Sequence, residues 1–404
     1  MLVNLSRLKT IPLHDLASRW VELRPRGRHF VGICPFHAEK TPSLSVIDNR
    51  FHCFGCGADG DALDFVQRIQ NMTLAEAARW LSREYSIDIE EGEDPHARLR
   101  YVLNHLTNLF EMDRYVVQPY LDSRGITSQM SEYWRLGYSD NPVHPLMKEV
   151  GLLSSEGHFL MNHRLIFPIC DRNGQVISMA GRVMPGKQGP KYINGQQSEL
   201  YDKSVTLYGL HRAYRSIQEK GEVILAEGYT DVILLHSIGV TNSVAACGTG
   251  ITEGHLHQLS SLTGRLVICT DPDEAGVKAA LRTIGIAGRY NISAEVLILQ
   301  EDPADAVNNG KFSLTSRVPG FLFMKQNFQG EEFELITKSL EIVMGYKNFI
   351  KKDLEIKNLS NIFGVSIRAL NAELKRMQWR RRDSSESNLI GSRHGRYPGR
   401  RLNS

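Results

Sequence analysis

Short apolar runs alternate with helically spaced apolar residues through the middle of the chain. The apolar runs cover residues 223–226, 242–247, 266–269 and 295–299, and the segments between them repeat apolar residues at helical intervals. Strands that alternate with helices predict βαβ units, right-handed crossovers and a parallel sheet. We therefore predict a Rossmann-like α/β region over residues 216–312.

Acidic residues follow three of these predicted strands. Glu227 comes directly after the first run, and Asp271 and Asp273 come after the third. Asp302 follows the fourth run. Because the carboxyl ends of parallel strands share one edge of a sheet, these four side chains should meet there. A lone acid after a strand is usually a solvated loop residue, but four on one edge predict a site for Mg²⁺ or Mn²⁺ and for phosphates.

Two pairs of residues near the N-terminus have the spacing of metal ligands. Cys34 and His37 form the first pair, Cys53 and Cys56 form the second, and 15 residues separate the pairs. Three thiolates and one imidazole complete a tetrahedron with no open position, which predicts one structural Zn²⁺. Alternating residues on either side of the first pair predict short strands, so we expect a zinc ribbon within residues 1–90.

Composition constrains the class of protein less than these motifs do. The chain has 404 residues, 42% of them apolar and 23% charged, as in ordinary soluble proteins. Its 48 basic and 45 acidic residues give a net charge of +3, so nucleic-acid binding must depend on local patches. No apolar run approaches the ~20 residues that span a membrane, and no secretion signal begins the chain. Six cysteines without such a signal favour a reducing location, which we expect to be the cytoplasm. The lack of an apolar run of spanning length predicts no membrane partner.

Basic and aromatic residues recur in two segments that flank these motifs. Spaced bases and tyrosines suit a groove that holds a nucleic-acid backbone or a triphosphate, although an ordinary solvated surface explains the pattern equally well. The candidates before the zinc ligands are Arg24, Arg26 and Arg28. The candidates before the α/β region are Arg164, Arg182, Lys191, Tyr192, Asn194 and Lys203.

The order of the motifs resembles the bacterial-type (DnaG-like) DNA primases over roughly residues 5–375. Residues 34–43 and 51–57 resemble the zinc-binding domain of that family, and residues 120–127 resemble the opening of its catalytic core. The Glu227-Gly228 pair, the Gly-Thr at 248–249 and the Asp-x-Asp at 271–273 are similar to a toprim domain.

The resemblance implies a DNA-dependent RNA primase that uses ribonucleoside triphosphates on a single-stranded DNA template and makes an RNA primer. It implies that Glu227, Asp271 and Asp273 are metal-binding catalytic acids and that Asp231 supports them. The related primases often read Asp-Pro-Asp in the last acidic loop, where this chain has Asp-Pro-Ala-Asp at 302–305. Asp302 fits the family pattern, and Asp305 is a second candidate ligand for Mg²⁺.

The chain should be a multidomain α+β protein. We expect a zinc-ribbon domain (1–90), a linker (91–97), a basic subdomain of the primase core (98–215), a toprim subdomain (216–312), a helical subdomain (313–378) and a disordered basic tail (379–404). Residues 359–370 resemble a helix-turn-helix, which is either a DNA reader or part of a packed helical subdomain.

Two features leave other functions open. The altered acidic loop and the absence of room for the family's helicase-binding domain are compatible with a non-catalytic, primase-derived protein that binds DNA or docks at a replisome. A replicative helicase remains a candidate partner. A toprim nuclease is less consistent with the zinc ribbon, and the chain lacks a P-loop, which argues against a fused primase–helicase.

Overall fold

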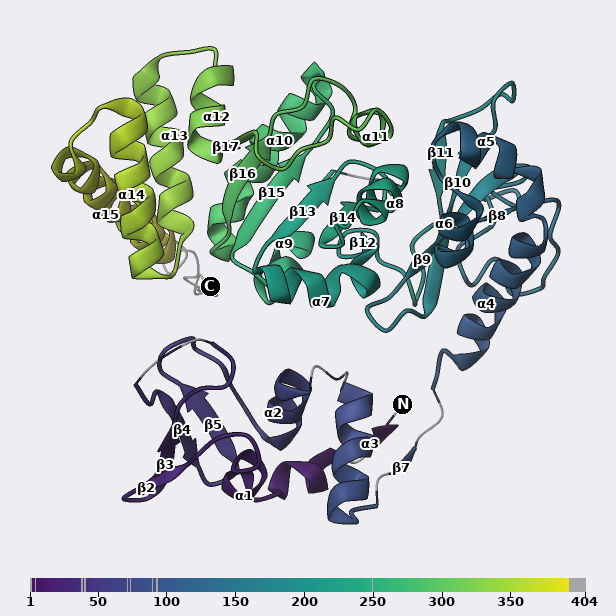
Figure 1. Ribbon diagram of the computed structural model, residues 1–404. Coiled ribbons are helices and arrows are strands. Elements are labelled where there is room, and N and C mark those ends of the chain that lie inside the picture. The colour runs from purple at the N-terminus through teal and green to yellow at the C-terminus, as the bar shows by residue number, and fades with distance from the viewer. Residues whose placement is uncertain are drawn as a thin grey trace, which may run out of the picture. The chain divides into compact units, whose positions relative to one another are not determined.

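The computed structural model describes residues 2–3, 5–37, 39, 41–70, 72, 74–88, 90–91, 94–248 and 250–391, and only the backbone of 2–3, 90–91 and 381–391 (Figure 1). It forms two compact units, Met1–Arg98 and Leu99–Ser404. The predicted linker, 91–97, lies beside this division, and its residues 92 and 93 are outside the described part, as is Thr249 of the predicted Gly-Thr motif. No helix within the described residues is long and apolar enough to cross a membrane.

The first unit is built on a five-stranded antiparallel sheet, which confirms the predicted zinc ribbon. Its strands, in spatial order, are β2 (Arg24–Arg26), β3 (His29–Gly32), β4 (Leu44–Ile47), β5 (Arg50–Cys53) and β6 (Asp59–Gly60). Leu44, Val46, Phe51 and Cys53 are buried while their neighbours in the strands face outward, as the period of two requires. The other elements are β1 (Leu2–Val3), α1 (Leu13–Ala17), α2 (Ala62–Ile69), α3 (Leu74–Tyr85), β7 (Glu90–Glu91) and a 3-10 helix (Leu5–Thr10).

The second unit begins with a four-stranded antiparallel sheet in the order β11-β10-β9-β8. Its strands are β8 (Gly137–Tyr138), β9 (Arg164–Cys170), β10 (Val176–Val183) and β11 (Tyr192–Asn194). The helices of this part are α4 (Ala97–Met112), α5 (Gln118–Ser123), α6 (Ser128–Tyr133) and a 3-10 helix (Arg114–Val116). A turn at Asp171–Gly174 joins β9 to β10, and β11 pairs with β10 at the edge of the sheet.

The predicted α/β region is a six-stranded sheet in the order β12-β14-β13-β15-β16-β17. The four predicted strands are β13 (Val223–Ala226), β14 (Ser243–Ala246), β15 (Arg265–Cys269) and β16 (Ser293–Leu297), and their pairings with one another are parallel. Two short antiparallel edges, β12 (Leu207–Tyr208) and β17 (Arg317–Pro319), were not predicted, because so few residues carry no readable period. The helices are α7 (Leu210–Lys220), α8 (Tyr229–Ser237), α9 (Glu253–Ser260), α10 (Glu274–Ala287), α11 (Pro303–Asn308) and a 3-10 helix (Gly288–Tyr290).

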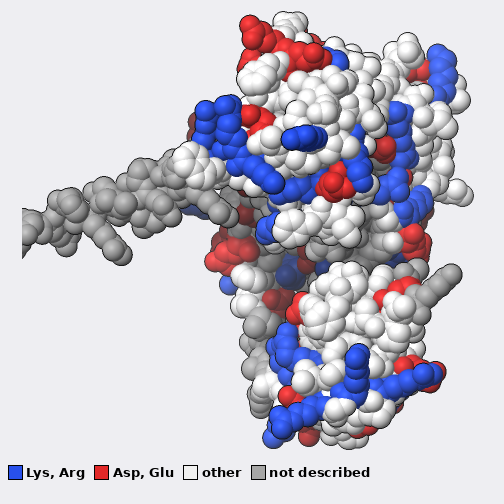
Figure 2. All heavy atoms as spheres, turned by 90° about the vertical axis from the view of Figure 1, so that its left-hand side faces the viewer, with Lys and Arg blue, Asp and Glu red and all other residues white. Residues whose placement is uncertain are grey.

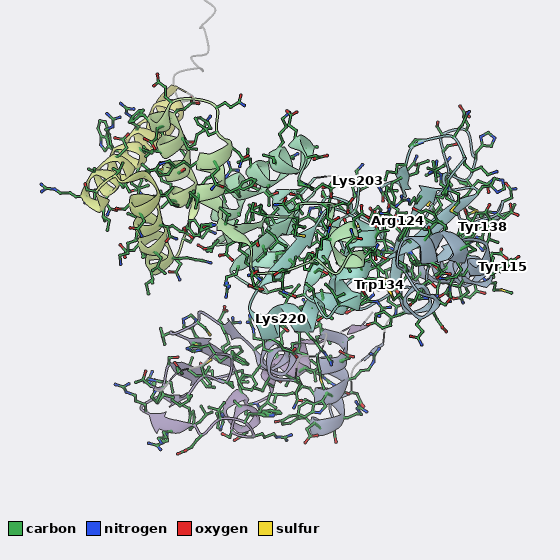
Figure 3. All side chains as sticks on the ribbon, turned by 45° about the horizontal axis from the view of Figure 1, so that its top comes forward. Tyr115, Arg124, Trp134, Tyr138, Lys203 and Lys220 are labelled. Atoms are coloured by element: carbon green, nitrogen blue, oxygen red, sulfur yellow. The ribbon has the colours of Figure 1, made fainter. Side chains whose placement is uncertain are left out.

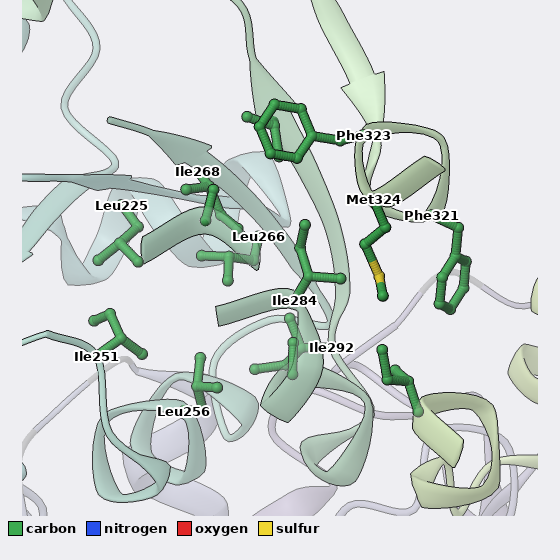
Figure 4. Close-up of a cluster of buried hydrophobic side chains, with 14 of the residues drawn as sticks. Leu225, Ile251, Leu256, Leu266, Ile268, Ile284, Ile292, Phe321, Phe323 and Met324 are labelled. Atoms are coloured by element: carbon green, nitrogen blue, oxygen red, sulfur yellow. The ribbon is translucent and has the colours of Figure 1, made fainter. Parts of the chain in front are cut away.

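A continuous apolar core joins this sheet to the C-terminal helices. Leu225, Leu266 and Ile268 of the sheet belong to the same buried cluster as Ile284 and Phe321 (Figure 4). Burial of such side chains stabilises the fold by about 1.5–3 kcal/mol each. The sheet therefore has a firm base, and its carboxyl edge is free to carry the polar residues described below.

Four helices end the described chain: α12 (Gly320–Asn327), α13 (Glu332–Gly345), α14 (Phe349–Phe363) and α15 (Ile367–Gly391). Gly364 ends α14 in the left-handed conformation, and the Oγ of Ser366 caps α15 by accepting from the Ala369 N–H, at 3.2 Å. The predicted disordered tail began at residue 379, but α15 continues to Gly391. The buried part of α15 overcomes the cost of nucleation, and the Lys, Arg, Met and Gln at 375–378 are good helix formers. Residues 392–404 of the predicted tail are outside the described part.

Candidate active site and zinc centre

The four predicted zinc ligands converge in the first unit. The ligand atoms of Cys34, His37, Cys53 and Cys56 all lie within 4.8 Å of one another. The Sγ atoms of Cys34 and Cys56 are 3.9 Å apart, close to the roughly 3.8 Å that tetrahedral Zn–S bonds impose. The Nδ1 of His37 lies 3.8 Å from the Sγ of Cys53. These residues fit a structural zinc ion with no open coordination position.

Glu39 orients this ligand set. Its Oε2 lies 3.1 Å from the Nε2 of His37, which leaves Nδ1 free to face the thiols. Its Oε1 accepts hydrogen bonds from the backbone N–H groups of Cys34, at 2.6 Å, and Ser43, at 3.3 Å. A carboxylate on the second ring nitrogen fixes the tautomer of a ligating histidine. The sequence motif contains Glu39, but its role was not predicted, because spacing alone identifies only the ligands themselves.

The acidic residues of the second unit lie at the carboxyl edge of the toprim-like sheet, as the topology predicted. Glu227 directly follows β13, and its Oε2 accepts from the backbone N–H of Asp271, at 3.2 Å, beyond the end of β15. Asp273 caps α10 by accepting from the Gly276 N–H, at 2.7 Å. Asp302 caps α11 by accepting from the Ala304 N–H, at 2.9 Å. The two caps hold these carboxylates at fixed positions on the edge.

Burial and mutual repulsion raise the pKa values of two of these acids. Burial, followed by the charges of Glu227, Asp302 and Asp273, raises the pKa of Asp271 to about 6. Burial and the charge of Asp302 raise the pKa of Asp231 to about 7, against a hydrogen bond from the Gly228 N–H to its Oδ2, at 2.8 Å. Accumulated negative charge of this kind is relieved by a bound cation, so the donor set fits a divalent metal.

A cavity of about 350 Å³ lies over this edge of the sheet. Glu227, Asp231, Asp271 and Asp302 are among the residues that line it. The cavity also contains the basic and polar side chains of Arg124, Arg182, Lys191, Tyr192, Asn194, Tyr229 and Thr230. In Figure 3, Arg124 lies where the part of the second unit that contains β8 to β11 meets the toprim-like sheet. Carboxylates that face three cations form a site able to hold a metal together with phosphate groups.

The predicted basic residues do not all contribute to this cavity. Arg182, Lys191, Tyr192 and Asn194 line it, and the guanidinium of Arg182 lies 3.1 Å from the Tyr192 hydroxyl. Lys203 is not among the lining residues. Arg24, Arg26 and Arg28 are exposed on β2 and the turn after it, in the other unit.

Arg164 was predicted to contact nucleic acid, but the structure gives it a different environment. It is 6% exposed, and its Nη1 donates to the carbonyl oxygen of Pro190, at 2.8 Å. Burial lowers the pKa of its guanidinium. It therefore holds the segment that carries Lys191, and the pattern of spaced bases could not distinguish such a buried arginine from an exposed one.

Arg124 and Asp305 are paired at the side of the cavity. The Nη1 of Arg124 lies 3.9 Å from the Oδ1 of Asp305, and Asp305 itself is not a lining residue. The side-chain amide of Asn308 donates to the Arg124 carbonyl oxygen, at 3.1 Å. Arg124 was not predicted as a site residue, although the Arg-Gly at 124–125 lies in a segment that resembles primases.

A zinc ribbon joined to a core with a carboxylate-edged toprim sheet defines the class of this chain. Family models match residues 4–97 (CHC2 zinc finger), 105–214 (DNA primase catalytic core, N-terminal domain) and 221–298 (Toprim domain). The chain belongs to the DnaG-type DNA primase family.

Individual relatives agree with this assignment. The DNA primase of Halalkalibacterium halodurans is 28% identical over 91% of this chain and 70% of that protein. The DNA primase of Rickettsia felis is 31% identical over 85% of this chain and 64% of that protein, so the chain spans about two thirds of these curated relatives. The solved zinc-binding and RNA polymerase domains of the Aquifex aeolicus primase superpose with a TM-score of 0.61 at 27% identity, covering 91% of this chain and 98% of that one.

Proposed function

We propose that this protein is a DNA-dependent RNA primase, which makes short RNA primers on single-stranded DNA from ribonucleoside triphosphates. The observation that carries the proposal is the cavity in which Glu227, Asp271 and Asp302 face Arg124, Arg182 and Lys191. Such a site has an acidic side for a metal and a basic side for phosphates. The zinc ribbon and the DnaG-type core support the same assignment.

Glu227, Asp271 and Asp302, which line the cavity, would hold Mg²⁺ or Mn²⁺, and Asp273, which is not among the lining residues, would assist them from the start of α10. When bound there, the metal would supply charge neutralisation for in-line displacement of pyrophosphate by the primer 3′-hydroxyl. Lys191 and Arg182 bind and orient the triphosphate, and Tyr192 and Asn194 form the wall beside it. Asp231 lies beneath this edge, where its Oδ2 fixes the Gly228 N–H next to Glu227 and so supports the conformation of that loop.

Asp305 would act on the nucleotide indirectly, through Arg124. It pairs with the Arg124 guanidinium at 3.9 Å, and Asn308 on the same helix binds the Arg124 carbonyl. Both contacts keep Arg124 over the carboxylates of the cavity. Asp305 is thus a positioning residue in this proposal, and Asp302 is the residue of the last acidic loop that would hold the metal.

The zinc ribbon would bind the template. Arg24 and Arg26 are exposed on β2, and Arg28 is exposed in the turn that follows. Phe54, 78% exposed, lies beside the ring of His52, at 4.7 Å between ring centroids. Arginines that hold phosphates and exposed rings that stack on bases are the usual components of a single-strand binding surface.

Primer synthesis from labelled ribonucleotides on single-stranded templates tests the proposed function. We expect oligoribonucleotides with Mg²⁺ or Mn²⁺, and a loss of about 100-fold or more in D271N, because a charged group that acts in the transition state is removed. A wild-type protein that makes no product on varied templates contradicts the proposal. Cleavage of DNA in the same reactions would indicate a nuclease, and unchanged template binding without synthesis would indicate a non-catalytic protein.

A further inference from the structure

Helix α15 carries basic residues and one large aromatic residue on a single face. Arg368, Lys375 and Trp379 are spaced seven and four residues apart, which places them on the same side of a helix. Trp379 is 66% exposed, although tryptophan is usually well buried in a folded protein. Arg376 and Arg380 are also exposed and flank this face. We call these five residues the α15 basic face.

The opposite side of the helix is anchored in the protein core. Leu370 and Leu374 are 1% and 6% exposed, and they belong to the cluster shared with α13 and α14. Met377 packs partly against the same cluster. The rotation of α15 about its axis is therefore fixed, and its basic face must point to solvent. In Figure 2, Lys and Arg side chains gather where the described side chains of α15 end and the grey residues begin.

The charge on this part of the helix is concentrated, and in the part whose side chains are described the acid paired with it is Glu373. Residues 375–382 read Lys-Arg-Met-Gln-Trp-Arg-Arg-Arg, with five basic residues among eight and no acid. Arg376 is paired with Glu373, at 3.0 Å, on an exposed surface where such pairs contribute little. Arg376 and Arg380 are like charges four residues apart, which destabilises a helix. A bound polyanion would remove that repulsion.

We propose that the α15 basic face is a second binding site for single-stranded nucleic acid, outside the catalytic cavity. Its phosphates would contact Lys375, Arg376 and Arg380, and a base would stack on Trp379. This site goes beyond the proposed function, because it shares no residue with the cavity and requires no catalysis. A membrane surface is the poorer match, because a helix that lies on lipid exposes an apolar face, and the apolar face of α15 is buried.

Binding of a fluorescent oligothymidylate to the full chain, measured by anisotropy at several salt concentrations, tests this site. We expect W379A to weaken binding about tenfold, because one stacked base is lost. The triple variant K375Q/R376Q/R380Q should lower the slope of log K against log salt by about 2, since each phosphate contact contributes about 0.7. W379F should retain most of the affinity because it keeps an aromatic ring.

The matched control is K278Q/K338Q/K357Q, which removes three exposed lysines from α10, α13 and α14. It should leave both the affinity and the salt slope near those of the wild type, and all variants should melt at similar temperatures. An α15 triple variant that behaves like this control overturns the proposal. Unchanged binding by W379A also overturns it, even if the charge variants weaken binding, because stacking is part of the site. Equal binding to phosphatidylserine vesicles and to the oligonucleotide would likewise contradict it.

Discussion

Asp231 lies on the first turn of α8 with 7% of its surface exposed, among three other acids. Its pKa is raised to about 7, whereas an unfolded aspartate has a pKa near 3.9. The unfolded chain therefore loses this proton first as the pH rises. The contribution of Asp231 to stability is complete below pH ~3.9 and is lost as the pH rises to about 7.

The D231N variant tests the direction in which stability changes with pH. Without added Mg²⁺, we expect the wild type to lose thermal stability between pH ~4 and ~7, and D231N to lose less. At pH 8 the variant should melt higher by at least about 1.5 °C, a shift that corresponds to about 1 kcal/mol in a folding unit of roughly 300 residues. Added Mg²⁺ should reduce the difference, because a cation favours the ionised form. A steeper decline in D231N than in the wild type would contradict the assigned cause.

Replacement by asparagine should have different effects at Asp302 and at Asp305. D302N removes a proposed metal contact, so the Mg²⁺ concentration that gives half-maximal synthesis should rise. D305N should instead raise the KM for the nucleotide about 10-fold while leaving the Mg²⁺ midpoint and kcat near wild type, because only the position of Arg124 changes. A shift of the Mg²⁺ midpoint in D305N as large as that in D302N would show that Asp305 is itself a ligand.

At the scale of elements, α11 fastens the turn between α5 and α6. Gly125 in that turn has φ +78°, and a Cβ there would lie 1.9 Å from the Oδ1 of Asn308. The sequence contains this Arg-Gly pair, but only the tertiary structure shows which residue limits the space beside it. Asn308 also holds Arg124 beside the toprim-like sheet, because its side-chain amide donates to the Arg124 carbonyl oxygen, at 3.1 Å, across 184 residues of sequence.

Replacement of Gly125 by alanine should lower the free energy of unfolding. We expect G125A to lower stability by about 1 kcal/mol or more, since alanine is strained at a positive φ and also meets Asn308. The double variant G125A/N308A should recover the part that is due to the collision, but not the backbone strain. Denaturant unfolding of the wild type, G125A, N308A and the double variant measures the free energy due to the collision and the free energy due to backbone strain. Strict additivity of the two substitutions would contradict the proposed contact.

Strands and helices were predictable where the pattern of apolar residues was long and regular. The four parallel strands and the ribbon strands were predicted from apolar or alternating residues, and the structure buries those apolar residues in the cores. The edge strands β12 and β17 have two and three residues, too few for a period. The end of α15 was predicted too early, because the charge of the segment suggested disorder while its buried first turns nucleate a helix.

At the scale of the whole molecule, zinc belongs to one compact unit and the carboxylate cavity to the other. The C53S variant should therefore lose bound zinc and the thermal transition of the first unit, while the transition of the second unit remains. Template-dependent initiation should fall in the same variant. Metal analysis and calorimetry check these outcomes, and a full zinc content in C53S would exclude the assigned ligands.

The sequence by itself determined the zinc ligands, the alternation of strands and helices, and the acids that follow the strands. Those features are local, because spacing and periodicity are set by neighbours in the chain. The tertiary structure decided which cations face the acids, because Arg124, Arg182 and Lys191 reach the cavity from segments far away in sequence. It also showed that Arg164 is buried, that Asp305 pairs with Arg124, and that Trp379 points to solvent. Burial and pairing depend on what packs against a residue, and that is fixed only when the whole chain has folded.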